Sequence, residues 1–396
     1  MDAFFVDLGR RVRERWQAVD FSLAAFPDIA RTALEENPPA TRVDLTALIR
    51  SFLRDDEQPY QTASGFGQPE LVVFDDPRFY IQLLFWLDGT TQIHQHEFSG
   101  AFHVLAGSSL HAEFVFANMR PVTAHFRLGD LQLTGTELLE TGRTVPITSG
   151  AGSIHSLFHL ETPSVTVVVR THSDPGTGPQ FTYLPPHVAV DPFFSDALTT
   201  RRLQLLDVLD RTGAGDYAEV VRSMVAALDY ERGFFTLQNC FVALHERGEW
   251  EETWNVFAEK HGALSAYAAS TLEEIVWCDR LVGLRSSIED ADHRFFLALL
   301  LNVPRAAEIL RLVAGRFPGD PVGTVLGWAE ELSESSDEGT WILDAKYPAE
   351  EKDEEKEAPL DRFLATLARC LNGETDPTDA ARREALARSS LRALVV

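Results

Sequence analysis

Short β-prone segments separated by glycines occupy residues 66–190 and limit the possible folds more than any other feature of the chain. Segments 71–74, 79–86, 111–116 and 164–170 are rich in Val, Phe, Leu and Thr, most of which favour strands. Turn signals separate such segments at a spacing of roughly ten residues, which is typical of a β-sandwich or barrel. The alternation of strand and helix that a parallel sheet requires does not occur here. The sequence therefore predicts an antiparallel β region in the middle of the chain.

A short helical segment is predicted before this region, over residues 1–65. Phe5, Leu8, Val12 and Trp16 recur at three- and four-residue spacing, which places them on one apolar stripe of a helix. We expect this segment to pack as plain structural helices.

A larger helical region is predicted after the β region, over residues 191–396, where glycines become rare and helical periodicity returns. Segments 234–245 and 249–261 have the pattern of a helical hairpin, although no fixed repeat period supports a named repeat family. Residues 330–358 are strongly acidic and are expected to form a solvated linker within this region.

Composition narrows the class of protein. The chain has 396 residues, 35 Lys and Arg, and 60 Asp and Glu, which gives a formal net charge of −25. Such an acidic balance argues against binding to a nucleic-acid backbone, which needs clustered basic residues. No apolar run of about 18 residues and no signal-peptide core are found, so we expect no membrane partner. Three cysteines are too few for a disulfide framework, and a reducing cytoplasmic location fits.

Histidine is concentrated in the β region, where nine of the chain's twelve histidines lie between residues 94 and 187. His94 and His96 are two apart, so in a strand both imidazoles point to one face and can reach a common metal ion. A third histidine, His155, follows the glycine-rich turn that begins at Gly150. Three neutral imidazoles hold a divalent metal and leave positions open for other ligands.

This pattern resembles the motifs of the cupin superfamily. Gly89, His94, His96 and Gly107 occupy positions of the first cupin motif, and the residues from Gly152 to His155 match the second. The resemblance implies an α+β protein with a central cupin β-barrel (double-stranded β-helix), a short N-terminal helical segment and a large C-terminal all-α domain.

One motif position departs from the four-ligand cupins. Gly100 stands where such cupins have a metal-binding Glu, so only His94, His96 and His155 are expected to bind the metal. Within the superfamily, the sequence is most similar to the three-histidine thiol dioxygenases of the cysteine dioxygenase type, over about 110 residues. That family lacks the Glu as well, and it uses iron(II). The arginine that binds the substrate carboxylate in this family is not found near residues 68–70.

Two further residues are predicted to take part in catalysis. Arg170 and His172 share one strand face, and alignment with the family places that face in the pocket. Arg170 could then bind an anionic group of the substrate, while His172 acts as an acid–base or holds a water. The structural alternative is that Arg170 pairs with an internal carboxylate and that His172 lies at a solvent-exposed strand end.

The other histidines are assigned from strand parity. His159 lies four residues after His155 and is predicted to orient a ligand imidazole. His103 has the opposite parity from Gly100 and should face away from the site. His111 and His125 are expected on the barrel surface or at strand ends.

The function expected from these observations is an iron(II) oxygenase or oxidase that uses dioxygen on a small anionic substrate bearing a thiol or an amine. Zinc or nickel are alternatives for the metal, and zinc would perform hydrolytic chemistry. The alternative function is a non-catalytic metal- or ligand-binding cupin whose helical domain binds a protein partner or self-associates. A third possibility is that the helical region closes over the barrel mouth and shapes the pocket.

Overall fold

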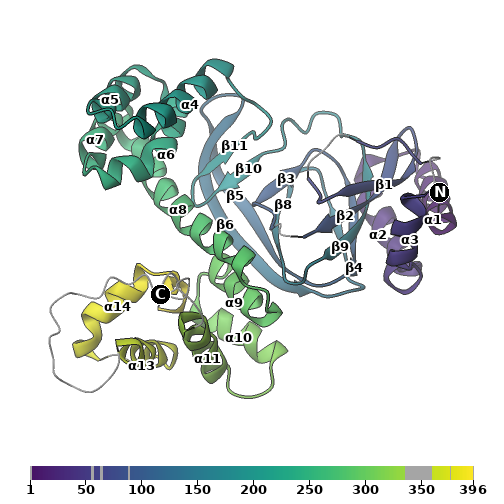
Figure 1. The fold of residues 1–396 in the computed structure, drawn as a ribbon. Coiled ribbons are helices and arrows are strands. Elements are labelled where there is room, and N and C mark those ends of the chain that lie inside the picture. The colour runs from purple at the N-terminus through teal and green to yellow at the C-terminus, as the bar shows by residue number, and fades with distance from the viewer. Residues whose placement is uncertain are drawn as a thin grey trace.

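Helices flank a central β-barrel on two sides (Figure 1). The computed structural model describes residues 2–54, 58–62, 66–87, 90–334, 359–374 and 376–395. Every strand of these residues lies between Glu70 and Val190, and the helices lie before and after them. The expected fold class, a β-barrel with a short N-terminal and a large C-terminal helical region, is confirmed.

The strands form two sheets. Five strands pair in the order β1-β2-β9-β4-β7, and a closed barrel follows the order β10-β11-β6-β5-β8-β3. The strands are β1 (Glu70–Asp75), β2 (Phe79–Trp86), β3 (His94–His96), β4 (Gly100–Ala106), β5 (Ser109–Pro121), β6 (Phe126–Leu139), β7 (Thr144–Ile147), β8 (Gly150–His159), β9 (Ser164–Thr171), β10 (Thr182–Leu184) and β11 (Val188–Val190). All of their pairings are antiparallel.

The N-terminal helices cover the outer face of the five-stranded sheet (Figure 1). They are α1 (Ala3–Gln17), α2 (Phe26–Glu36) and α3 (Leu45–Phe52). The apolar stripe of α1 is buried as expected, and its N-terminus is capped by the Asp2 carboxylate, which accepts from the Phe4 N–H. The helix ends before Asp20 and Phe21, whose positive φ angles of 52° and 56° reverse the chain.

Strand β2 shows that this sheet is covered on both faces. All eight of its residues are buried. Phe79 and Ile81 pack against the N-terminal helices, whereas Leu84 and Trp86 belong to the cluster inside the barrel. Leu139 and Leu157, from the other sheet, complete that interior cluster. Side chains of both sheets therefore enclose the interior.

The C-terminal helices pack on the other sheet. They are α4 (Ala197–Arg211), α5 (Tyr217–Ala227), α6 (Tyr230–Glu246), α7 (Trp250–His261), α8 (Ser265–Ser287), α9 (Ala291–Asn302), α10 (Ala306–Arg316), α11 (Pro321–Glu334), α13 (Pro359–Leu371) and α14 (Ala380–Ala387). Helices α6 and α7 confirm the predicted hairpin. Leu272, early in α8, packs in one cluster with Phe126, and Leu281 packs in another with Phe158. The long helix α8 therefore joins both groups of helices to the barrel (Figure 1).

The acidic segment predicted as a linker at 330–358 begins inside helix α11, which continues to Glu334. Its first residues are therefore helical, and residues 335–358 lie outside the described part of the chain. Among the helices that the structure describes, none is both long and apolar enough to cross a membrane.

His103 lies on β4, on the face of the sheet that the N-terminal helices cover. Its neighbours at alternate positions, Ala101 and Leu105, belong to the cluster formed with those helices. The imidazole is 0% exposed, and its Nδ1 shares a hydrogen bond of 2.8 Å with the Thr144 hydroxyl. The prediction that His103 faces away from the barrel interior is confirmed.

Burial lowers the pKa of His103 to about 4. As the pH falls, the His103 imidazole takes up a proton in the unfolded chain before it does so in the folded protein. Its contribution to the free energy of unfolding is therefore complete above about pH 6.5 and is lost as the pH falls to about 4. Chemical denaturation with a chelator present should show a free energy of unfolding that falls over this range. In His103→Gln the fall should be smaller by about 3 kcal/mol. Equal slopes in the two proteins would contradict this assignment.

Candidate metal centre

Three histidines converge inside the barrel from two neighbouring strands. His94 and His96 lie on β3, and His155 lies directly opposite His94 on β8. One ring nitrogen from each of the three lies within 4.8 Å of the others, and all three side chains are buried. Strand alternation sends Gln95, between the two β3 histidines, to the other face, where it accepts a hydrogen bond of 2.6 Å from the Tyr183 hydroxyl. The structure thus brings together the three residues predicted to bind metal.

A hydrogen bond at Nδ1 sets the orientation of two of these rings, those of His94 and His155. His94 Nδ1 lies 2.7 Å from the Gln92 carbonyl oxygen. A carbonyl can only accept, so this nitrogen carries the proton and Nε2 keeps a free lone pair. His155 Nδ1 lies 2.8 Å from His111 Nε2, an arrangement that points its own Nε2 inward.

The inward nitrogens have the properties of metal ligands. His94 Nε2 is buried and has no hydrogen-bond partner among the described residues. His96 Nε2 and His155 Nε2 lie only 2.9 Å apart. A buried nitrogen without a partner is costly, and a divalent cation at this point would accept all three lone pairs. The donor set therefore fits a metal ion.

Electrostatics keep these rings neutral. Burial lowers the pKa of His94, and it lowers the pKa of His96 and His155 well below the ordinary value. The positive charge of Arg170 acts in the same direction on His96. A neutral imidazole is the form that coordinates a metal, so these three rings are in the protonation state that metal binding requires.

Gly100 excludes a fourth protein ligand from the adjoining position. It pairs with both Ile147 and Arg170, so it lies between two strands of the five-stranded sheet. A Cβ atom added at Gly100 would lie 2.1 Å from the carbonyl oxygen of Val169, a backbone atom that cannot move aside. The position at which the motif resemblance predicts a missing carboxylate ligand therefore has no room for a side chain.

Arg170 lies on β9 two residues after Val168, which belongs to the cluster inside the barrel, so strand alternation places both side chains on one face. Its guanidinium stacks on Phe98, with Cζ 3.4 Å from the ring centroid, and lies 5.0 Å from the ring of Tyr80. Nε and Nη2 donate to the carbonyl oxygens of Thr171 and His172. No carboxylate of the described residues forms an ion pair with it, so the expected alternative of an internal pair is not found. Desolvation lowers the pKa of Arg170.

The other two predicted site residues are placed differently from the prediction. His172 follows the last residue of β9, is exposed, and its Nε2 bonds the Asp76 carbonyl at 3.0 Å, which matches the alternative of a strand end. His159 is fully buried, but its Nδ1 bonds the Ser109 hydroxyl at 2.8 Å and its ring stacks on Trp86. His159 therefore does not orient a ligand imidazole by a hydrogen bond.

His111 has the role predicted for His159. The expectation that His111 lies on the barrel surface or at a strand end is wrong, because its side chain is buried and bonds His155. Its neighbour Leu110 packs against the C-terminal helices, so adjacent side chains on both faces of β5 are buried. The prediction for His125 agrees with the structure, since it is partly exposed and pairs with Asp191 beside β6.

Comparisons with known proteins found similarity to solved structures. No family model and no curated protein matches the sequence. Similar solved structures include KdgF from Halomonas sp., 16% identical over 30% of this chain and 93% of that chain, with a TM-score of 0.21. A cupin-2 domain containing protein from Shewanella frigidimarina NCIMB 400 is 15% identical over 33% and 97%, with a TM-score of 0.20.

A third similar structure is hydroquinone 1,2-dioxygenase from Sphingomonas sp. TTNP3, 11% identical over 28% of this chain and 70% of that chain, with a TM-score of 0.22. The matched share is about the size of the barrel region. None of these three proteins is described as a cysteine dioxygenase, so that narrower resemblance stays a prediction.

The close contact at Gly100 leads to a test of the site's construction. Gly100→Ala should lower the free energy of unfolding by about 1–3 kcal/mol, because the new methyl group overlaps the β9 backbone. The matched control is Gly135→Ala on β6, where the nearest atom to an added Cβ lies 3.8 Å away. Its stability should be unchanged or higher by up to about 1 kcal/mol. Equal stability of the two variants in urea denaturation would contradict the assigned contact.

Proposed function

We propose that this chain is a mononuclear iron(II) enzyme that uses dioxygen to oxidise a small anionic substrate. The observation that carries the proposal is the convergence of three buried, neutral imidazole nitrogens, one of them without any partner in the described chain. His94, His96 and His155 would hold the metal. Three protein ligands would leave coordination positions open, and a bound iron(II) would supply sites for dioxygen and substrate there.

The ligand rings are held by their own surroundings. The Gln92 carbonyl fixes the tautomer of His94, and His111 supports His155 from behind. Such supporting contacts keep a ligand ring in one orientation and raise its basicity. His111 is therefore a positioning residue in this proposal, and it touches neither metal nor substrate.

The charges of the site support an anionic substrate. Three neutral imidazoles leave the full charge of a divalent metal uncompensated, which favours an anionic donor such as a thiolate. Arg170, on the opposite sheet, brings a second positive charge that forms no ion pair with any carboxylate of the described residues, although nearby carboxylates, Glu97 first among them, act on it at longer range. We infer that a substrate would bind Arg170 through a carboxylate and the metal through a thiol or an amine.

Apolar side chains around the three histidines would exclude water from the reaction site. Phe98 and Phe102 pack beside the rings of His96 and His155, with centroid distances of 4.6 and 6.0 Å. The Phe66 ring covers the edge of His94 at 5.5 Å and touches Trp86. A low-dielectric wall strengthens the attraction between Arg170 and a substrate anion.

Metal content and oxygen uptake test the proposal together. The full-length protein, loaded anaerobically with iron(II), should hold one iron per chain by elemental analysis. It should consume oxygen with at least one member of a panel of small thiols and amines. His94→Ala should lose both properties by a factor of at least about 100, since a ligand is removed. The matched control, His103→Gln, removes a buried imidazole from the outer face of the five-stranded sheet, away from the three histidines, and should keep both.

Two results would contradict this function. Tightly bound zinc or nickel together with hydrolytic activity would favour the alternative metal chemistry. Metal binding without turnover would favour a non-catalytic cupin with a helical interaction domain.

One observation favours this non-catalytic alternative: helix α4 exposes Leu198, Leu205 and Val208, with exposed fractions of 58%, 65% and 55%. Such a patch is typical of protein–protein contacts.

Arg170 offers a separate test of the substrate class. Arg170→Gln should raise KM by roughly 10- to 100-fold for substrates with a carboxylate, because one charge-assisted pair is lost. Iron content should not change, and KM for matched thiols or amines without a carboxylate should also stay the same. An equal loss with both kinds of substrate would mean that Arg170 acts by its packing on Phe98 alone.

A further inference from the structure

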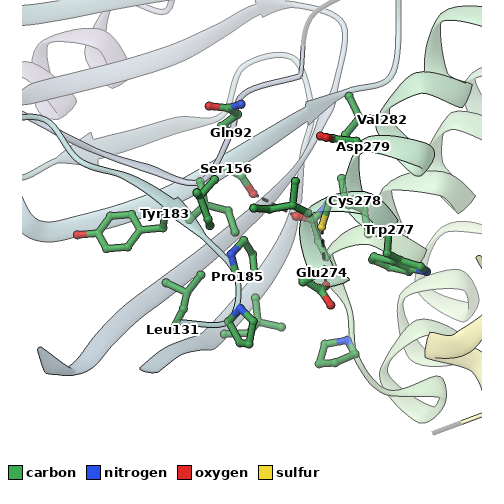
Figure 2. Close-up of a pocket in the computed structure, with 18 of the residues that line it drawn as sticks. Gln92, Leu131, Ser156, Tyr183, Pro185, Glu274, Trp277, Cys278, Asp279 and Val282 are labelled. Atoms are coloured by element: carbon green, nitrogen blue, oxygen red, sulfur yellow. Dashed lines mark hydrogen bonds between the residues drawn. The ribbon is translucent and has the colours of Figure 1, made fainter. Parts of the chain in front are cut away.

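A cavity of about 650 Å³ lies between the barrel and helices α8 and α9 (Figure 2). Ile93 and Ser156 form part of its strand wall. These residues directly precede His94 and follow His155, and adjacent strand residues point to opposite faces. The cavity therefore lies behind the two strands that carry the candidate metal ligands, on the far side from the metal centre. In the part of the helical region that the structure describes, α8 and α9 meet the barrel on this side, and no residue of these helices contacts the three histidine rings.

The walls of this cavity are mainly apolar and are held in place from both sides. Figure 2 shows Tyr183 and Leu131 on the strand side of the cavity, and Trp277 and Val282 on the side of helix α8. The Ser156 hydroxyl donates to the Asn302 side-chain oxygen at 3.1 Å, which links β8 to α9. A volume of this size, with an apolar lining and a few polar groups, is typical of sites for small organic ligands.

Three charged side chains line the cavity, and two of them neutralise each other. Arg392 donates to the Glu274 carboxylate at 2.5 Å and stacks on Trp277 at 3.6 Å. Asp279 has neither an ion pair nor a hydrogen bond with any described residue. The cavity therefore carries one uncompensated negative charge, on the exposed side chain of Asp279. Partial burial raises the pKa of that carboxyl, as expected for a carboxylate with no cation nearby.

We propose that this cavity binds a small molecule with an apolar body and a cationic amine, at a site separate from the metal centre. The apolar body would lie against Ile93, Leu131 and Val282, and the ammonium group would donate to Asp279. Anionic ligands are disfavoured, because Arg392 is already paired with Glu274 and Asp279 would repel a second negative charge.

Isothermal titration calorimetry with octylammonium tests the proposal, with octanoate and octanol as equally long anionic and neutral probes. The full-length protein should bind one octylammonium per chain and should bind it more tightly than either other probe. Asp279→Asn should weaken this binding by roughly fivefold. Val282→Trp, which fills the cavity from a side chain that is 36% exposed, should weaken it at least as much.

Two control variants distinguish binding in this cavity from binding elsewhere on the protein. Glu273→Gln removes a neighbouring exposed carboxylate of the same helix that does not line the cavity, so it measures non-specific attraction to a chain of net charge −25. His94→Ala disables the proposed metal centre and should leave octylammonium binding unchanged. The proposal is overturned if octylammonium binds no tighter than octanol or octanoate. It is equally overturned if Asp279→Asn and Glu273→Gln have the same effect, or if His94→Ala abolishes binding.

Discussion

The approach of three neutral imidazoles inside a low-dielectric barrel is the interaction on which this account depends. His96 Nε2 and His155 Nε2 lie 2.9 Å apart, close enough to share one proton, and His94 Nε2 has no partner among the described residues. Without a cation, this arrangement leaves the buried His94 Nε2 unsatisfied, which costs on the order of 1–3 kcal/mol. With a divalent metal, the same arrangement is a preformed site. The hydrogen bonds at Nδ1 of His94 and His155 then orient these two rings toward the metal position.

Coverage of both sheets by helices determines what surrounds this centre. The N-terminal helices bury the outer face of the five-stranded sheet, and helices α8 and α9 pack against the outer face of β5 and of β8, the strand that carries His155. Both faces of these strands are therefore inside the protein, one facing the histidines and one facing helices. The cavity beside Asp279 exists because the second packing is incomplete. One strand pair thus separates two chemically different spaces.

The same double coverage explains which predictions from sequence succeeded. Alternation in a strand was enough to place His94 and His96 together, and the glycine-flanked motif located His155 as the third member. Alternation could not say which face of β5 is inside, because Leu110 and His111 are both buried. The partner of His155 was therefore missed. The cavity between barrel and helices was also beyond prediction, because it depends on how distant segments pack and not on any local pattern.

Crystallography at the iron absorption edge tests the central claim most directly. Crystals of the full-length protein loaded with iron(II) should give one strong anomalous peak per chain. We expect the peak at about 2.1 Å from one ring nitrogen each of His94, His96 and His155. The account is contradicted if the anomalous peak lies elsewhere, or if no peak appears and the three imidazoles are hydrogen-bonded to one another in iron-soaked crystals.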